Sequence, residues 1–216
     1  MSNALSYQEI THLQGNLPTS PGRILIAEDD PVVAASMTQD VRELGYTVVG
    51  PASNGGQAIE LAKCERPDLA LLDIRMPVIG GFGAATVLSR HMDIPVVMVS
   101  AYTELEYLDA GQRVGVFGYL IKPITIEHLR FGIAVAWARY RDRQRLRGQV
   151  RELKIAIQDR KDIERAKGIL MDKLGLNERN AMRRLQKQAR NARRRLADTA
   201  RAIVESDKLF SEIDGP

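Results

Sequence analysis

Four short apolar runs in this chain each end in polar or charged side chains, and this pattern constrains the fold more than any other feature. An acidic cluster, a lone acid, a hydroxyl and an ammonium group follow these runs: Glu28-Asp29-Asp30, Asp73, Ser100 and Lys122. Short continuous apolar runs are typical of parallel strands buried on both faces, and such sheets bind ligands at the carboxyl ends of their strands. We therefore expect all four groups at one edge of one sheet.

Strand signals alternate with helical periodicity through residues 23–135. The expected strands are 23–27, 47–52, 69–73, 95–99 and 117–121. Pro31 suits the first turn of a helix and Gly45 its end, and further helices are expected after Gly55, at 83–91 and at 104–115. This order predicts an α/β fold with a five-stranded, doubly wound parallel sheet.

A helical pattern then runs without a stop from Ile126 to about Leu174 and predicts a long linker helix. Four of its apolar residues follow the 4-3-4 spacing of a coiled-coil seam: Leu146, Val150, Leu153 and Ile157. Because the seam covers only about two heptads, two interpretations stay open. Either the seam joins two copies of the chain, or the helix packs on its own C-terminal module.

The C-terminal segment predicts a small module of three helices, of which the end of the long helix is the first. Asn177 suits an N-cap, and Glu178 suits the positive end of a helix dipole, so a second helix is expected from there to about Arg190. A third helix is expected from Ala192 to Ser206, with an apolar stripe that belongs to the core.

The two halves of the chain carry opposite charge. Residues 22–135 hold 9 basic and 14 acidic residues, a net charge of −5, whereas 136–216 hold 22 basic and 12 acidic residues, a net charge of +10. A basic half is typical of binding to nucleic acid or to an anionic surface. A solvated helix face is nevertheless the commoner explanation of any single basic run.

Composition also bears on compartment and redox chemistry. No apolar stretch approaches the roughly 20 residues that span a bilayer, and no signal-peptide core is visible, so we expect a cytoplasmic protein with no membrane partner. The single cysteine, Cys64, cannot form an intramolecular disulfide and is expected to be half-buried on a helix. Residues 1–22 are polar and lack a period, which predicts a disordered tail.

The groups at the predicted sheet edge suit a divalent metal and a phosphoryl group. Carboxylates are hard oxygen ligands, and a lysine neutralises phosphoryl oxygens. With these groups at these offsets after successive strands, residues 23–135 resemble a response-regulator receiver domain, whose fold is flavodoxin-like. Two positions depart from the family's pattern: Glu28 stands where many receivers have Asp, and Gly80 replaces a residue that is commonly acidic or an amide.

The receiver resemblance implies a phosphoacceptor and a metal site. Asp73 is the implied acceptor, phosphorylated by a sensor histidine kinase, and Mg²⁺ is the implied cofactor. Asp29 and Asp73 would bind the ion directly, Glu28 would hold it through water, and the backbone carbonyl of Arg75 would supply a further oxygen. No enzyme activity is expected beyond self-catalysed phosphoryl transfer to Asp73 and its hydrolysis.

Three further residues have implied roles around the phosphoryl group. Lys122 would pair with it, Ser100 would hydrogen-bond one of its oxygens, and Tyr119 would turn inward as the switch. The peptide bond between Lys122 and Pro123 is implied to be cis.

The string Ala166-Lys167-Gly168-Ile169-Leu170-Met171, with Gly175 and the small apolar positions after it, closely resembles the ANTAR domain. That family consists of RNA-binding transcription antiterminators. The resemblance implies that a phosphorylated homodimer binds a tandem pair of RNA hairpins. It divides the chain into a tail (1–22), a receiver (23–135), a linker (136–158), an ANTAR domain (159–206) and a second tail (207–216).

Positive charge and the ANTAR string together select the candidate RNA-binding residues: Lys167, Gly168, Arg183, Arg184, Lys187, Arg190 and Arg194. Phosphate contacts by the cations would make binding salt-dependent. Gly168 either lets an RNA backbone approach closely or allows tight helix packing. Phe210 is the sole aromatic residue after Tyr140, so base stacking on aromatic side chains is not expected.

Three other functions compete with this interpretation. A DNA-binding factor regulated by phosphorylation is the main alternative, because Leu176-Asn177 can imitate the turn of a helix-turn-helix. A phosphohydrolase with Asp73 as nucleophile would need an acid/base carboxylate where Arg75 stands. A regulator controlled by a protein partner without phosphorylation would not need the intact set of Asp29, Asp73, Ser100 and Lys122.

Overall fold

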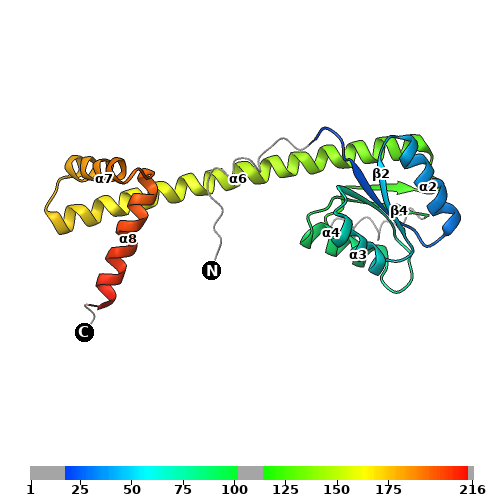
Figure 1. Cartoon of the computed structure of the whole chain (residues 1–216), viewed down its shortest axis with the longest axis horizontal. Helices are drawn as coiled ribbons and strands as arrows, with labels where there is room; N and C mark the ends of the chain where they lie inside the picture. The colour runs from blue at the N-terminus through cyan, green and yellow to red at the C-terminus, as the bar shows by residue number, and fades with distance from the viewer. Residues whose placement is uncertain (1–17, 102–113, 214–216) are drawn as a thin grey trace. The chain divides into compact units, whose positions relative to one another are not determined.

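The computed structural model describes residues 18–101 and 114–213, with side chains described up to residue 207. The chain divides into two compact units, Met1–Arg145 and Leu146–Pro216. The first unit contains the sheet and the second contains the C-terminal helices, while α6 (Ile126–Leu174) contributes to both (Figure 1).

The first unit is built on five parallel strands in the order β2-β1-β3-β4-β5. Their bounds are Arg23–Ala27 (β1), Thr47–Ala52 (β2), Leu69–Asp73 (β3), Val96–Ser100 (β4) and Gly118–Ile121 (β5). Every residue of β3 and β4 is buried, as a sheet covered on both faces requires. The predicted parallel α/β fold is confirmed, and each strand begins and ends within one residue of its expected bounds.

Helices cover both faces of the sheet (Figure 1). One face is covered by α2 (Pro31–Glu43) and the start of α6, which bury Met37, Val41, Leu129 and Ile133. The other face is covered by α3 (Gly55–Glu65) and α4 (Gly81–His91), which bury Ala58, Ala62, Ala84, Ala85 and Leu88. Alternate residues of each strand point into one core or the other, as the strand period of two requires.

Three expectations for the first unit are not confirmed. The helix expected at 104–115 falls mostly on residues 102–113, and the disordered tail expected at 1–22 falls mostly on residues 1–17; both segments lie outside the described part of the chain. The expectation for Cys64 is wrong, because this residue is exposed. On α3 the buried face carries Ala58 and Ala62, and a residue two positions after Ala62 lies on the opposite side of the helix.

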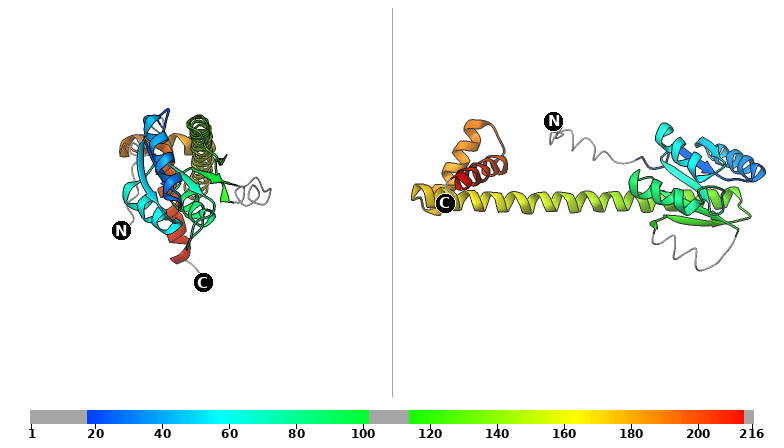
Figure 2. Two further views of the ribbon diagram at one scale, coloured as in Figure 1. Left: turned by 90° about the vertical axis from the view of Figure 1, so that its right-hand side faces the viewer. Right: turned by 90° about the horizontal axis from the view of Figure 1, so that it is seen from below.

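The second unit packs α7 (Glu178–Ala192) and α8 (Leu196–Ile213) on the last turns of α6 (Figure 2). Its core contains Ala166 from α6, Leu185 from α7, and Ala200 and Val204 from α8.

Both bounds expected for the third helix are wrong, because α8 begins four residues after Ala192 and ends at Ile213, seven residues after Ser206. Arg193 adopts a left-handed conformation with φ 53°, which ends α7. The N–H groups of Arg193 and Arg194 donate back to the carbonyls of Arg190 (3.1 Å) and Ala189 (3.0 Å), a common helix-ending motif. The chain is therefore free to begin a new helix only at Leu196.

None of the described helices combines the length and the apolar composition that crossing a bilayer requires. Even α6, with 49 residues, is rich in charged side chains.

Candidate functional site

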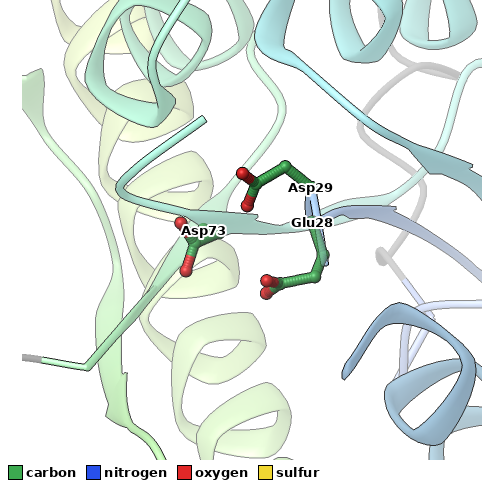
Figure 3. A group of neighbouring side chains, drawn as sticks. All are labelled: Glu28, Asp29 and Asp73. Atoms are coloured by element: carbon green, nitrogen blue, oxygen red, sulfur yellow. The ribbon is translucent and has the colours of Figure 1, made fainter. Parts of the chain in front are cut away.

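Asp73 and Glu28 are buried carboxylates at the carboxyl edge of the sheet. Asp73 is the last residue of β3, and Glu28 follows β1, the strand beside it. Only 6% of Asp73 and 3% of Glu28 is exposed, whereas Asp29 is exposed. One carboxylate oxygen from each of these acids lies within 4.8 Å of the others, and the carboxylates gather around a common space in Figure 3. The fold thus brings together acids that are 44 residues apart in the sequence.

Lys122 enters the same cluster from the end of β5. Its Nζ lies 2.8 Å from Asp73 Oδ1, donates a hydrogen bond of 2.8 Å to Glu28 Oε1 and lies 2.7 Å from Glu28 Oε2. The Lys122 N–H donates to the carbonyl of Ser100 at 2.7 Å, and the peptide bond to Pro123 is cis, as the resemblance implied. One cation is therefore shared by two buried carboxylates.

Burial and ion pairing act against each other on the pKa values of this cluster. Burial raises the pKa of Glu28, and the charge of Asp73 raises it further, although the hydrogen bond to Lys122 lowers it. Burial lowers the pKa of Lys122, but its bonds to Asp73 and Glu28 outweigh burial, and the net shift of this pKa is upward. Lys122 is thus an ammonium ion at neutral pH, and additional positive charge near Glu28 would lower the pKa of this residue.

The third residue of the acidic cluster, Asp30, has a different position. Its Oδ1 accepts hydrogen bonds from the N–H groups of Val32 (2.8 Å) and Val33 (3.3 Å), so Asp30 is the N-cap of α2. Glu28 and Asp29 instead project toward Asp73 (Figure 3). Asp30 therefore caps α2, whereas Glu28 and Asp29 belong to the acidic site around Asp73.

The loop after β3 is held tightly against Asp73. The N–H of Arg75 donates to Asp73 Oδ2 at 2.6 Å and fixes the plane of the carboxylate. A Cβ on Gly81 would lie 2.0 Å from the Asp73 carbonyl oxygen, so only glycine lets α4 begin there. Between them, Val78 has φ 65°, which is rare for a β-branched residue.

Ser100 and Tyr119 lie on the two strands that follow β3 in the sheet. Ser100 ends β4, is 5% exposed, and comes one residue after Val99, the register partner of Asp73. Tyr119 is the register partner of Met98 and packs, half-buried, against the core under α3 and α4. Burial raises the pKa of Tyr119. The hydroxyl of Ser100 is therefore carried to the same sheet edge as Asp73, with Tyr119 on the next strand.

The acids fit a hard divalent cation such as Mg²⁺. Carboxylate oxygens are its preferred protein ligands, and Lys122 offsets only one of the three negative charges of Glu28, Asp29 and Asp73. Mg²⁺ keeps several water ligands, and the exposure of Asp29 leaves one side of the cluster open to water.

A second candidate site is the exposed side of α7. Ala181, Leu185 and Ala189 are buried on one side of this helix. The other side and the turn after the helix expose Arg179, Arg183, Arg184, Lys187, Arg190, Arg193 and Arg194, which we call the basic surface. Within the described residues, no carboxylate forms an ion pair with any of these seven cations. Five of the seven predicted RNA-binding residues belong to this surface.

The other two predicted RNA-binding residues, Lys167 and Gly168, lie on α6. Lys167 Nζ is 2.7 Å from Glu178 Oε1 and 2.9 Å from Glu164 Oε2, and its side chain is 11% exposed. Apart from its chain neighbours and the backbone of its own helix, no described atom lies within 4 Å of the position that a Cβ on Gly168 would occupy, so tight packing against another element does not account for this glycine. Ala166 differs from it, because this residue is fully buried in the core.

Sequence reasoning missed a network of ion pairs that joins α6 to α8 and to Arg195, the residue before α8. Asp159 lies 2.7 Å from Arg195 and 3.2 Å from Arg201, and Asp162 lies 3.1 Å from Arg201. The spacing of the two acids, one helical turn apart, was visible in the sequence. Their partners were not, because they lie 36 to 42 residues further along the chain.

Two protein families match the chain. Residues 24–134 match the response regulator receiver domain, and residues 151–204 match the ANTAR domain. The chain belongs to the ANTAR response regulators. Both families are regulatory and not catalytic, which agrees with the interpretation of this protein as a regulator.

This ANTAR response regulator is similar over most of its length to the transcriptional regulatory protein PdtaR of Mycobacterium tuberculosis. The two are 34% identical over 186 residues, which cover 86% of this chain and 91% of that protein. The transcriptional regulatory protein PrrA of Mycobacterium bovis is 38% identical over 112 residues, 51% of this chain and 47% of that protein. Among solved structures, the signal receiver domain of a modulated diguanylate cyclase from Desulfovibrio desulfuricans has a TM-score of 0.52 and 32% identity, covering 56% of this chain and 96% of that one.

Proposed function

We propose that this ANTAR response regulator is phosphorylated on Asp73 by a sensor histidine kinase and in that form binds RNA hairpins to prevent transcription termination. The observation that carries phosphorylation is the 2.8 Å pairing of buried Asp73 with Lys122 inside an acidic cluster. The proposal for RNA is supported by the basic surface, whose cations form no ion pair with any carboxylate among the described residues.

Each residue of the receiver site has a step in phosphoryl transfer. Asp73 supplies the carboxylate oxygen that attacks phosphorus, and the N–H of Arg75 fixes the orientation of this carboxylate. As the bond between this oxygen and phosphorus forms, the bond between phosphorus and the histidine of the kinase breaks, and that histidine is the leaving group. The ammonium of Lys122 neutralises charge on the phosphoryl oxygens, and the Ser100 hydroxyl donates a hydrogen bond to one of them. Mg²⁺ bound by Glu28, Asp29, Asp73 and the Arg75 carbonyl would supply the remaining positive charge. Tyr119, on β5, is the switch residue, which turns inward after Asp73 is phosphorylated.

Phosphorylation is tested with acetyl phosphate and Mg²⁺. The intact protein is expected to gain the mass of one phosphate, and Asp73→Asn is expected to gain none. Removing Mg²⁺ with a chelator is expected to abolish labelling of the wild type. Normal labelling of Asp73→Asn would show that the acceptor lies elsewhere.

The basic surface offers several phosphate contacts at once. Because its cations have no ion pairs to break within the described residues, they can neutralise RNA phosphates and release counterions. The guanidinium groups also suit the planar edges of splayed loop bases. Gly168 adds a place on α6 where no described side chain obstructs a backbone.

The RNA function is tested by comparing a tandem-hairpin RNA with a duplex DNA of equal charge, using protein activated by beryllofluoride. Tighter binding to RNA is expected. Replacing Lys187 and Arg190 by Gln is expected to weaken binding and to reduce the salt slope by roughly 0.7–0.9 for each cation that no longer neutralises a phosphate. Equal affinity for the two nucleic acids would instead favour the DNA-binding alternative.

Dimerisation through the seam completes the proposal. Leu146, Val150, Leu153 and Ile157 are 61%, 50%, 63% and 58% exposed, and none of them belongs to the buried core of the C-terminal module, which supports the interpretation of the seam as a contact between two copies. A second copy would remove this apolar stripe from water. A dimer would also present two basic surfaces to two hairpins, which raises avidity without any new contact.

A further inference from the structure

Lys167 is the cation of the Ala166-Lys167-Gly168 string, yet its ammonium group contacts two carboxylates and is largely shielded from solvent. Its Nζ is 2.9 Å from Glu164, one turn earlier on α6, and 2.7 Å from Glu178, the first residue of α7. Only 11% of its side chain is exposed. The hydrogen bonds to Glu178 and Glu164 raise the pKa of Lys167, and the pairing lowers the pKa of Glu178.

The contact with Glu178 links two helices across a tight turn. Gly175, with φ 61°, follows the end of α6, and Asn177 caps α7 by accepting a hydrogen bond of 2.9 Å from Asn180 N–H. The core side of α7 consists of Ala181, Leu185 and Ala189. Two alanines among three buried residues provide few ridges that would fix how the helix is rotated. The ion pair at the first turn therefore constrains the direction of α7 where packing constrains it weakly.

The charges around Lys167 are unfavourable for a direct phosphate contact. Lys167 carries one positive charge, and Glu164 and Glu178 carry two negative charges within 2.9 Å of it. A phosphate that approached Lys167 would meet a net negative group and would have to displace a carboxylate. The seven cations of the basic surface impose no such cost within the described residues.

We propose that Lys167 is a positioning residue for RNA binding: it holds the first turn of α7 on α6 and so orients the basic surface, which makes the phosphate contacts. This inference rests on the proposed RNA-binding function. Under this proposal Glu178, although negatively charged, favours RNA binding, because it holds Lys167.

Glu178→Gln provides the decisive test, because the two roles of Lys167 give opposite signs. This side chain is 71% exposed, so the substitution is compatible with folding. If Lys167 positions α7, Glu178→Gln is expected to weaken binding of a tandem-hairpin RNA roughly fivefold although it removes a negative charge. If Lys167 contacts phosphate, the same change frees the ammonium and tightens binding, which would overturn the proposal.

The affinity of Lys167→Met for the same RNA is measured in parallel, with the full-length activated protein and over a series of salt concentrations. A positioning role leaves the salt slope as in the wild type, and a phosphate contact reduces it by roughly 0.7–0.9. Adding Lys167→Met to Glu178→Gln is expected to weaken binding little further, because both changes remove the same ion pair. Fully additive effects, or a reduced slope, would assign Lys167 to direct contact. Lys167→Arg is expected to restore most of the affinity.

Glu205→Gln is the matched control. Glu205 is an exposed acid of α8 that has no ion pair among the described residues, so this change alters the net charge equally without touching Lys167. It is expected to leave affinity unchanged or slightly tighter. Equal binding of hairpin RNA and duplex DNA by the wild type would refute the proposed function, while the signs of the Glu178 and Lys167 effects on that binding would still decide the positioning role. Absence of binding to either nucleic acid would refute both.

Discussion

Glu28 makes the stability of the receiver unit depend on pH. Burial and the charge of Asp73 raise its pKa above the ordinary 4.5 despite the hydrogen bond to Lys122. Between pH 4.5 and this raised pKa, the Glu28 side chain therefore holds a proton in the folded state that it has released in the unfolded state. The contribution of Glu28 to the free energy of unfolding is fully present below pH 4.5 and is lost as the pH rises through the raised pKa.

Glu28→Gln removes this titration. Without divalent cations, we expect the wild type to lose stability relative to Glu28→Gln as the pH rises from 4.5 through the raised pKa. Urea unfolding of both proteins at a series of pH values measures the difference. If the free energies of unfolding of the two proteins changed in parallel across this pH range, burial would not be raising the pKa of Glu28.

Val78 stores backbone strain in the loop after β3, close to Asp73. It has φ 65° and is 93% exposed, so its side chain gains little from packing. The carbonyl of its neighbour Ile79 accepts a hydrogen bond of 2.9 Å from the Gly55 N–H, which fixes the loop in this conformation. Asparagine tolerates left-handed backbone better than valine does.

Val78→Asn is therefore expected to raise the free energy of unfolding by about 1 kcal/mol, within the usual range for relief of one strained residue. Chemical denaturation measures it. Val32→Asn, at a 76% exposed valine within α2, is the control and is expected to stay within about 0.5 kcal/mol of the wild type. A destabilised Val78→Asn would mean that the valine has a contact that outweighs its strain.

Among the elements, α6 is fastened to the receiver unit well beyond its first turns. Asp93, after α4, accepts hydrogen bonds from Arg143 (3.2 Å) and Gln144 (2.5 Å). The Arg143 guanidinium also lies 4.4 Å from the centre of the Phe117 ring, just before β5. This clamp joins α4, β5 and α6, and so connects the strand that carries Tyr119 to the helix that carries the seam.

Arg143→Leu is expected to cost about 1 kcal/mol of stability, because it removes a charge-assisted hydrogen bond and a cation–π contact. It is also expected to speed hydrogen exchange in the adjoining turns of α6. Arg145→Leu is the control, since Arg145 is exposed and outside the clamp. Equal exchange in the two variants would mean that the clamp does not stabilise α6.

At the scale of the whole molecule, the proposed function requires that two chains associate. The seam residues are at least half exposed, and their spacing matches a two-stranded coiled coil. Replacing Val150 and Leu153 by Ser is expected to keep the beryllofluoride-activated protein at the mass of one chain, 24.0 kDa, in light scattering. Activated wild type is expected at twice that mass.

Ile155→Ser is the matched control for the seam. Ile155 is 38% exposed and lies on the other side of α6 from Leu153, so this change removes a similar apolar side chain and is expected to leave the dimer intact. A dimer that survives the change of Val150 and Leu153 would move the interface to another surface.

The sequence by itself determined the parallel sheet, the long helix and the strand-end acids and lysine of the receiver site. These features follow from local rules: buried parallel strands need continuous apolar runs, and their carboxyl ends share one edge. Glu28, Asp73 and Lys122 could therefore be placed together before any contact was known. Asn177 as an N-cap was equally local.

Only the tertiary structure decided which charged groups are engaged and which are available. No local pattern in the sequence predicts that Glu178, on the next helix, engages Lys167, or that Lys187 has no ion pair among the described residues. Likewise, Arg143 pairs with Asp93, which lies 50 residues earlier in the chain. Such pairings depend on how helices pack, because an ion pair forms within about 4 Å in space, and a helical period fixes only which side of its own helix a residue occupies.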